Sequence, residues 1–197
     1  MKITTVYTII IGLVSFALCS FTPIQDITTI PVDVSKSKVE WKARKIAGKH
    51  NGYISIASGT VETDGKIITG GQFVIDTKTM TDVDVRFKPA NHWLMKHLKN
   101  NFFEVNKYPE AKFIITSVTP NADIYMIVGK MTIKDSTQEI RFPAIISTTL
   151  TTVNAEATIK LDRRKFGIDY GSGLLKRMAN RAIYHDFELK IKLTAGN

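Results

Sequence analysis

The sequence predicts an all-β protein, an antiparallel barrel of eight strands with one short helix near residues 91–105. Three observations lead to this fold class. Apolar and polar residues alternate along one segment after another, which is the period of a strand with one buried face. Short turn sequences such as Asp64-Gly65 separate these segments, as in an antiparallel meander. Helices do not alternate with the strands as a parallel sheet would require, and closure into a barrel hides both the apolar face and the sheet edges.

The chain begins with the features of a secretory signal peptide. Lys2 precedes an apolar run, 6–18, which is shorter than the roughly 20 residues that span a bilayer. We assign residues 1–19 to this signal and expect a periplasmic or secreted protein. Cys19 is the only cysteine, so no intramolecular disulfide can form. It stands where a lipoprotein cysteine would stand, but Leu18 before it is a poor match, so lipid anchoring at Cys19 is less favoured than simple cleavage.

Residues 20–30 predict a linker, because the stretch is rich in threonine and has no clear period. The remaining residues, 31–197, are numerous enough for one domain with a substantial core. Clear alternation predicts strands at 39–44, 156–161 and 187–193, and weaker alternation predicts strands at 53–63, 70–77, 111–118, 125–134 and 139–146.

Helical spacing occurs at one place after the N-terminus. Trp93, Leu98 and Phe102 can gather on one side of a helix. Asn91 is the expected N-cap, because it follows Pro89 and its side chain can accept a backbone hydrogen bond. The helix must end before Pro109, and the strand at 111–118 follows.

The barrel interior decides between two structural interpretations. About eight strands enclose a space that is either filled by side chains or holds one slender ligand. Alternation predicts a lining of Trp41, Phe73, Ile75, Phe113, Ile115, Tyr125, Ile127, Phe142, Ile159 and Phe187. This lining excludes a sugar or nucleotide, since each unpaired buried polar group costs a few kcal/mol. It suits an alkyl or isoprenoid chain, although from the pattern alone a packed core without ligand is the favoured interpretation.

Several motifs carry a family resemblance. They are His97-Leu98, Phe102-Phe103-Glu104-Val105 and Lys107-Tyr108-Pro109, then Gly129 to Lys134 with Phe142-Pro143, and Leu161-Asp162-Arg163 with Phe166-Gly167. In order and spacing the chain resembles the YceI-like family of polyisoprenoid-binding, lipocalin-like periplasmic proteins from about Ile30 to Leu193. It departs from that family at Lys36, where a histidine is usual, and in the loop 47–52.

The resemblance implies a lipocalin-like barrel that binds a long-chain isoprenoid, either a quinone or a polyprenyl lipid. That lipid is the only bound small molecule it implies. The family's ligand contacts are scattered lining positions rather than a motif, so they cannot be transferred residue by residue. The resemblance leaves the headgroup contacts of this chain open.

Catalytic and metal-binding patterns are weak. The histidines lack metal-ligand spacing, and His92 and His97 would lie about 140° apart around a helix. Asp82 and Asp84 fall in a polar connection, where solvated turn carboxylates are commoner than catalytic ones. We therefore expect no catalytic residues, no metal site and no enzyme activity.

The net charge of +9 is the remaining global signal. Basic residues cluster at 42–49, 163–165 and 176–181 without interleaved aromatic residues, so nucleic acid is not an expected partner. A solvated surface is favoured, and transient contact with an anionic membrane is the alternative. The oligomeric state is not indicated.

Three functions remain open. The favoured one is an exported protein that sequesters or transports an isoprenoid lipid. The alternatives are an enzyme that acts on a lipid-like substrate in the same cavity, and a packed barrel scaffold that acts through its basic surface.

Overall fold

The structure is a computed structural model that describes residues 26–46, 48–149, 151–169 and 183–196. The predicted signal peptide, Cys19, most of the predicted linker and the basic cluster at 176–181 lie outside these residues. Among the described helices, none has the length and apolar character needed to cross a membrane.

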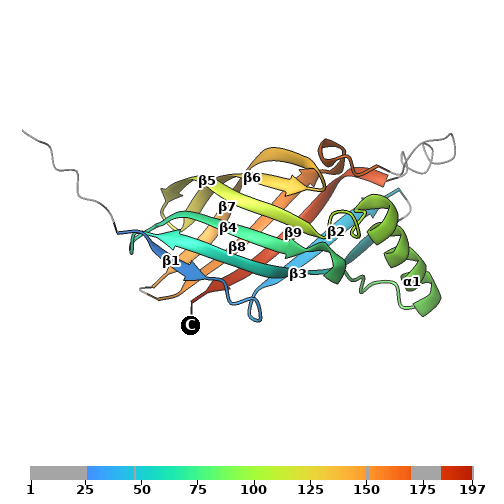
Figure 1. The fold of residues 1–197 in the computed structure, drawn as a ribbon, viewed down its shortest axis with the longest axis horizontal. Helices are drawn as coiled ribbons and strands as arrows, with labels where there is room; N and C mark the ends of the chain where they lie inside the picture. Colours follow the sequence, from blue (N-terminus) through green and yellow to red (C-terminus); the bar gives the residue numbers. More distant parts are fainter. Residues whose placement is uncertain (1–25, 47, 150, 170–182, 197) are drawn as a thin grey trace, which may run out of the picture.

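The described residues form a closed antiparallel barrel with a helix at one end (Figure 1). Its strands are β1 (Thr28–Pro31), β2 (Lys38–Lys45), β3 (Gly48–Thr63), β4 (Ile68–Asp76), β5 (Glu110–Asn121), β6 (Ile124–Ile133), β7 (Ser136–Thr148), β8 (Val153–Asp162) and β9 (Ile183–Ala195). Strands β3 to β9 pair in sequence order, and β2 joins β3 to β9 and closes the ring of eight. The predicted fold class is confirmed.

The last residues of the predicted linker, 28–30, belong to strand β1 instead. Residues Thr28–Pro31 pair with Thr60–Thr63 of β3, and the side chain of Ile30 is buried at 6% exposure. Val32 then forms a bridge to Ala195 of β9. With one buried residue the segment is too short to show a period, and its strand geometry comes from pairing with the long β3.

The side-chain alternation predicted from the sequence is present in the barrel wall. In β6, Ile127 and Met131 are buried, while Lys130 is exposed. In β2, Val39 and Trp41 are buried at 5% and 7% exposure. Because successive side chains of a strand point to opposite faces, these residues share the inner face of the closed sheet.

The helix differs from its prediction at its start. Helix α1 spans Lys88–His97, three residues earlier than expected, and a π-helical turn, η2 (Leu98–Phe102), continues it. Asn91 is therefore inside the helix and is not its cap. Pro89 stands in the first turn, where its missing N–H has no hydrogen bond to lose. The side chain of Asn91 instead donates to Asp82 and to the carbonyl of Val85.

Candidate functional site: two apolar cavities

The interior of the barrel contains an apolar cavity of about 110 Å³, which we term the barrel cavity. Seven of the predicted lining residues surround it: Phe73, Ile75, Phe113, Ile115, Ile127, Phe142 and Ile159. Ala144, Ala155 and Ala157 also face it and leave space beside the larger side chains. The side chains of the core therefore leave the centre of the barrel partly open.

Three phenylalanines form one wall of the barrel cavity. Phe73 of β4 lies opposite Phe113 of β5 in the register, and their rings stack with centroids 6.3 Å apart. The ring of Phe142 from β7 is tilted against Phe113 at 5.6 Å. Aromatic pairs at this distance stabilise each other beyond the area they bury, so they hold a fixed wall.

A second apolar cavity of about 270 Å³ lies between the barrel and α1, and we term it the mouth cavity. The predicted residues Trp41, Ile75 and Phe187 line it. Helix α1 and the π turn η2 complete it through Trp93, Leu94, His97, Leu98 and Phe102, together with Phe103 directly after η2.

The two cavities are neighbours. Val39, Ile75, Met131 and Leu189 line both. Tyr125 is the predicted residue that lines neither cavity, although it is buried at 7% exposure. The larger volume approaches the roughly 300 Å³ at which small-molecule sites begin.

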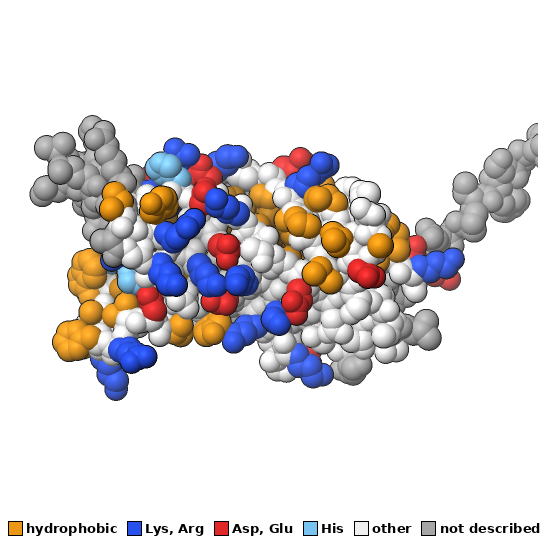
Figure 2. Space-filling model, turned by 180° about the vertical axis from the view of Figure 1, so that it is seen from behind, with side chains coloured by type: hydrophobic (Ala, Val, Ile, Leu, Met, Phe, Trp, Pro, Cys, Tyr) orange, Lys and Arg blue, Asp and Glu red, His pale blue; other side chains and the backbone are white. Residues whose placement is uncertain are grey.

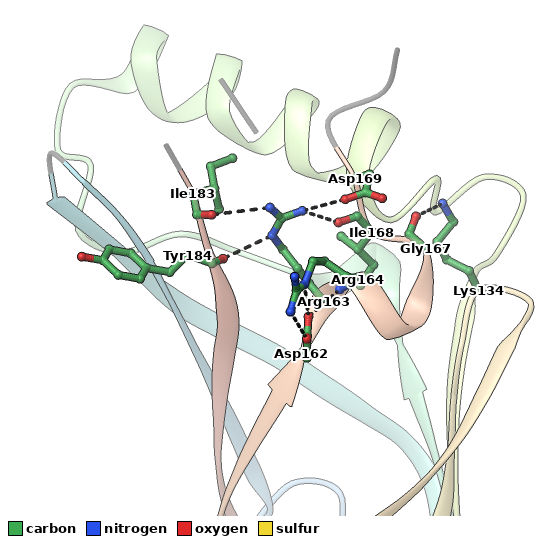
Figure 3. Close-up of polar contacts among 9 residues, drawn as sticks. All are labelled: Lys134, Asp162, Arg163, Arg164, Gly167, Ile168, Asp169, Ile183 and Tyr184. Atoms are coloured by element: carbon green, nitrogen blue, oxygen red, sulfur yellow. Dashed lines mark hydrogen bonds and ion pairs between the residues drawn. The ribbon is translucent and has the colours of Figure 1, made fainter. Parts of the chain in front are cut away.

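Arg163 is a polar residue that lines the mouth cavity, and it is buried rather than exposed. The sequence placed it in an exposed basic cluster, but only 4% of it is exposed. Its guanidinium donates to the carbonyl of Ile168 at 2.6 Å, to the carbonyl of Tyr184 at 3.2 Å and to Asp169 at 3.1 Å (Figure 3). Burial lowers the pKa of Arg163, but the side chain remains cationic at neutral pH because its ordinary value is so high.

The polar connection before α1 also differs from its prediction. Asp82 was expected to be solvated, yet its side chain is fully buried and lies 3.8 Å from Nδ1 of His50. Asp84 lies 3.3 Å from the same nitrogen. Burial raises the pKa of Asp82, and the nearby Asp84 carboxylate raises it further. Residues far apart in the sequence form this cluster, so the spacing of histidines alone could not reveal it.

Comparison with known proteins identifies the family. Residues 31–195 match the YceI-like domain, which is nearly all of the described chain. The chain belongs to the YceI-like family. A UPF0312 protein of Photorhabdus laumondii is 28% identical over 94 residues, which are 47% of this chain and 49% of that protein. The chain thus spans about half the length of the curated relative that it matches.

Solved structures share the fold of this YceI-like chain at low sequence identity. BcnA of Burkholderia cenocepacia has a TM-score of 0.66 and 22% identity, over 83% of this chain and 99% of that chain. A polyisoprenoid binding domain from Saccharophagus degradans has a TM-score of 0.65 and 12% identity, over 87% and 99%. The YceI protein of Campylobacter jejuni has a TM-score of 0.52 and 16% identity, over 66% and 74%.

Proposed function

We propose that this YceI-like protein is an exported lipid-binding protein that holds a long-chain isoprenoid, a quinone or a polyprenyl lipid, for sequestration or transport. The observation that carries the proposal is the pair of adjoining apolar cavities, one inside the closed barrel and one between the barrel and α1. An extended hydrocarbon chain can occupy such a space without leaving a polar group unpaired. The polyisoprenoid binding domain from Saccharophagus degradans, which has the same fold, supports this choice of ligand class.

The ligand would lie with its tail in the barrel cavity and its headgroup in the mouth cavity. The barrel cavity is lined entirely by apolar residues. The mouth cavity is also mainly apolar, but its lining includes the basic residues Arg44 and Lys45. Hydrogen-bond donors at this end suit a headgroup that carries acceptor oxygens, such as a quinone carbonyl or a phosphate.

The two cavities favour a binding function over a packed scaffold, which is the alternative that the sequence did not exclude. An empty cavity lowers the stability of a protein in proportion to its volume. A barrel that acts only as a scaffold would gain nothing in return for this loss. The barrel cavity has no acid or base in its lining, which supports binding over catalysis there, whereas the mouth cavity is also lined by His50, His97 and Asp186. We therefore propose a carrier without chemistry of its own.

The end of the barrel that carries α1 is the proposed point of contact with a membrane. Trp93 and Phe87 are 63% and 69% exposed there. Arg86, Lys88 and Lys96 are exposed beside them, and no acidic residue occurs from 85 to 103. Figure 2 shows hydrophobic and basic side chains together at this end of the molecule.

Exposed aromatic and basic residues suit an anionic membrane, where each Lys or Arg near the surface contributes about 1 kcal/mol. Trp93 also lines the mouth cavity. Contact at this end would place the cavity next to the lipid that it exchanges.

The ligand test uses protein purified from its own envelope. Native mass spectrometry followed by organic extraction should recover one isoprenoid lipid per chain. The protein is then delipidated and titrated with a long-chain isoprenoid quinone, and the thermal midpoint should rise because the ligand binds only the folded state. A protein that carries no lipid and shows no rise with any isoprenoid would contradict the proposal.

The export and membrane contact have separate tests. N-terminal sequencing should place the start of the mature chain near Ser20, whereas a diacylated Cys19 would contradict cleavage without anchoring. Sedimentation with anionic vesicles should capture the wild type, and Trp93→Ala should reduce the captured fraction. Ile145→Ala is a control, because Ile145 of β7 is also a large exposed apolar residue, at 60%, but lines neither cavity. Equal capture by neutral vesicles would refute the electrostatic part of the proposal.

A further inference from the structure

The local backbone explains why two acidic side chains meet one histidine beside the mouth cavity. The segment before α1 runs along β3, with hydrogen bonds from Thr81 N to Tyr53 O and from Val83 N to Asn51 O, at 2.9 and 3.0 Å. Residues two apart in an extended segment point to the same side. Asp82 and Asp84 therefore point together toward His50 of β3.

The three side chains offer one donor atom each within a small volume. Those atoms all lie within 4.8 Å of one another. Nδ1 of His50 is 3.8 Å from Oδ2 of Asp82 and 3.3 Å from Oδ2 of Asp84. Two ligands about 2.1 Å from a tetrahedral zinc ion are about 3.4 Å apart, so the observed separations fit around such an ion with small adjustments.

One oxygen of Asp82 provides a second, independent indication. Its Oδ1 accepts hydrogen bonds from Val85 N and from the side chain of Asn91, at 2.9 and 3.0 Å. Its Oδ2 is fully buried and accepts no hydrogen bond from the described residues. A buried carboxylate oxygen without a donor is costly, and a cation in the cluster would compensate it.

We propose that His50, Asp82 and Asp84 bind a divalent transition-metal ion, with Zn²⁺ as the probe. An imidazole nitrogen with two carboxylate oxygens is a ligand set that suits Zn²⁺, and a water molecule would complete four-coordination. The ion would fasten the segment that leads into α1 to strand β3. His50 also lines the mouth cavity, so the metal would stabilise one side of its entrance. This proposal does not depend on the lipid-binding function.

The test measures zinc binding to the full exported chain, prepared without a histidine tag and stripped with EDTA. Calorimetric titration with ZnCl₂ should give one ion per chain, and the thermal midpoint should rise with Zn²⁺ and return after EDTA. His50→Ala and Asp84→Asn should each weaken zinc binding by at least about tenfold, since even outer-shell changes have effects of this size. Co²⁺ should give the visible absorption of a four-coordinate site.

His92→Ala is the matched control, because His92 is exposed on α1 and lies outside the cluster. It should leave zinc affinity unchanged. Circular dichroism establishes that each variant is folded, and Asp84→Asn is the milder variant because Asp84 is 30% exposed. Absence of zinc binding by the wild type would overturn the proposal and leave the cluster as an ion pair. Equal binding by wild type and His50→Ala would also overturn it.

Discussion

The ring of Phe113 lies directly against the backbone of Gly129: a Cβ atom added at Gly129 would lie 2.5 Å from two carbons of that ring. Gly129 is on β6, in the inward-facing series with Ile127 and Met131. A side chain there would clash with the ring of Phe113 and with the backbone carbonyl oxygen of Ile114, which would also lie 2.5 Å from the added Cβ atom. Gly59 on β3 has the same relation to Phe73, at 2.9 Å.

We expect Gly129→Ala to lower the free energy of unfolding by about 1–3 kcal/mol, the usual cost of overpacking. The displaced ring should also weaken isoprenoid binding. Urea unfolding and quinone titration measure the two effects. Lys130→Ala, the next residue of β6 with an exposed side chain, should change neither. An unaltered Gly129→Ala protein would contradict the close packing of Gly129 against Phe113 and the Ile114 carbonyl.

Phe113→Ala separates a packed core from a ligand cavity. In a packed core the change would cost roughly 3–5 kcal/mol of stability. Phe113 borders open volume, so the apo protein should lose less, and the lost contacts should appear as weaker binding of the quinone. Ile114→Ala, whose side chain is 49% exposed on the same strand, is the control. A full packed-core loss in the apo form, with no effect of any isoprenoid, would refute the carrier.

Ala157→Phe adds volume to the barrel cavity instead of removing it. Ala157 lines this cavity opposite Ile191 of β9. The larger ring should fit the open space, keep the apo protein near wild-type stability and compete with the lipid. In a filled core the same substitution would cost about 1–3 kcal/mol. Thermal unfolding with and without added quinone distinguishes the two outcomes.

Arg163→Met should destabilise the loop at the mouth cavity. The change leaves the buried carbonyl of Ile168 and the part-buried carbonyl of Tyr184 without their guanidinium donor, and a buried unpaired group costs about 1–3 kcal/mol. Arg163→Lys should restore little, because an ammonium cannot replace the planar fork. Arg164→Met is the neighbouring control: Arg164 is 53% exposed, so its ion pair should contribute only about 0–1 kcal/mol. Urea unfolding measures the free energy of unfolding of each variant. Equal losses of stability in Arg163→Met and Arg164→Met would contradict the buried structural role of Arg163.

Asp162 should make stability depend on acid pH. Two hydrogen bonds from the Arg164 side chain lower the pKa of Asp162 from 3.8 to about 2. A lowered folded-state pKa stabilises the protein above the unfolded value, and this contribution disappears as pH falls from 3.8 toward about 2. The stability difference between wild type and Asp162→Asn, followed by urea unfolding, should be constant above about pH 5 and shrink through that window. A stability difference that does not change with pH would contradict the lowered pKa of Asp162.

The strands were predictable because each alternates against one buried face. Phe73, Phe113 and Phe142 line the barrel cavity, on the face to which alternation assigns them. Alternation gives the side to which a residue points but not its position along the barrel axis, so Tyr125 was included although it lines neither cavity. The first residues of β3, 48–52, were not predicted as strand, because Lys49 and Asn51 are polar and are held by pairing with β2.

The polar features of the site were not predictable from the sequence. The partners of Arg163 are mostly backbone carbonyls, which carry no residue signature. The approach of Asp82 to His50 depends on a segment that lies along β3 only in the folded chain. The earlier start of α1 is a simpler case, because proline is as compatible with a first helical turn as with the residue before it.

The pairing of β2 with β9 has a consequence for folding. Trp41 lies opposite Leu189, so the ring closes through a contact between residues near the two ends of the domain. Contacts of such high sequence separation form slowly, because a long loop must be ordered before they can form. Until β9 docks, β2 and β8 each present an open edge, and the hydrophobic interior is exposed. The last strand of the domain therefore completes the enclosure of the apolar interior, and the barrel has no finished wall before it is in place.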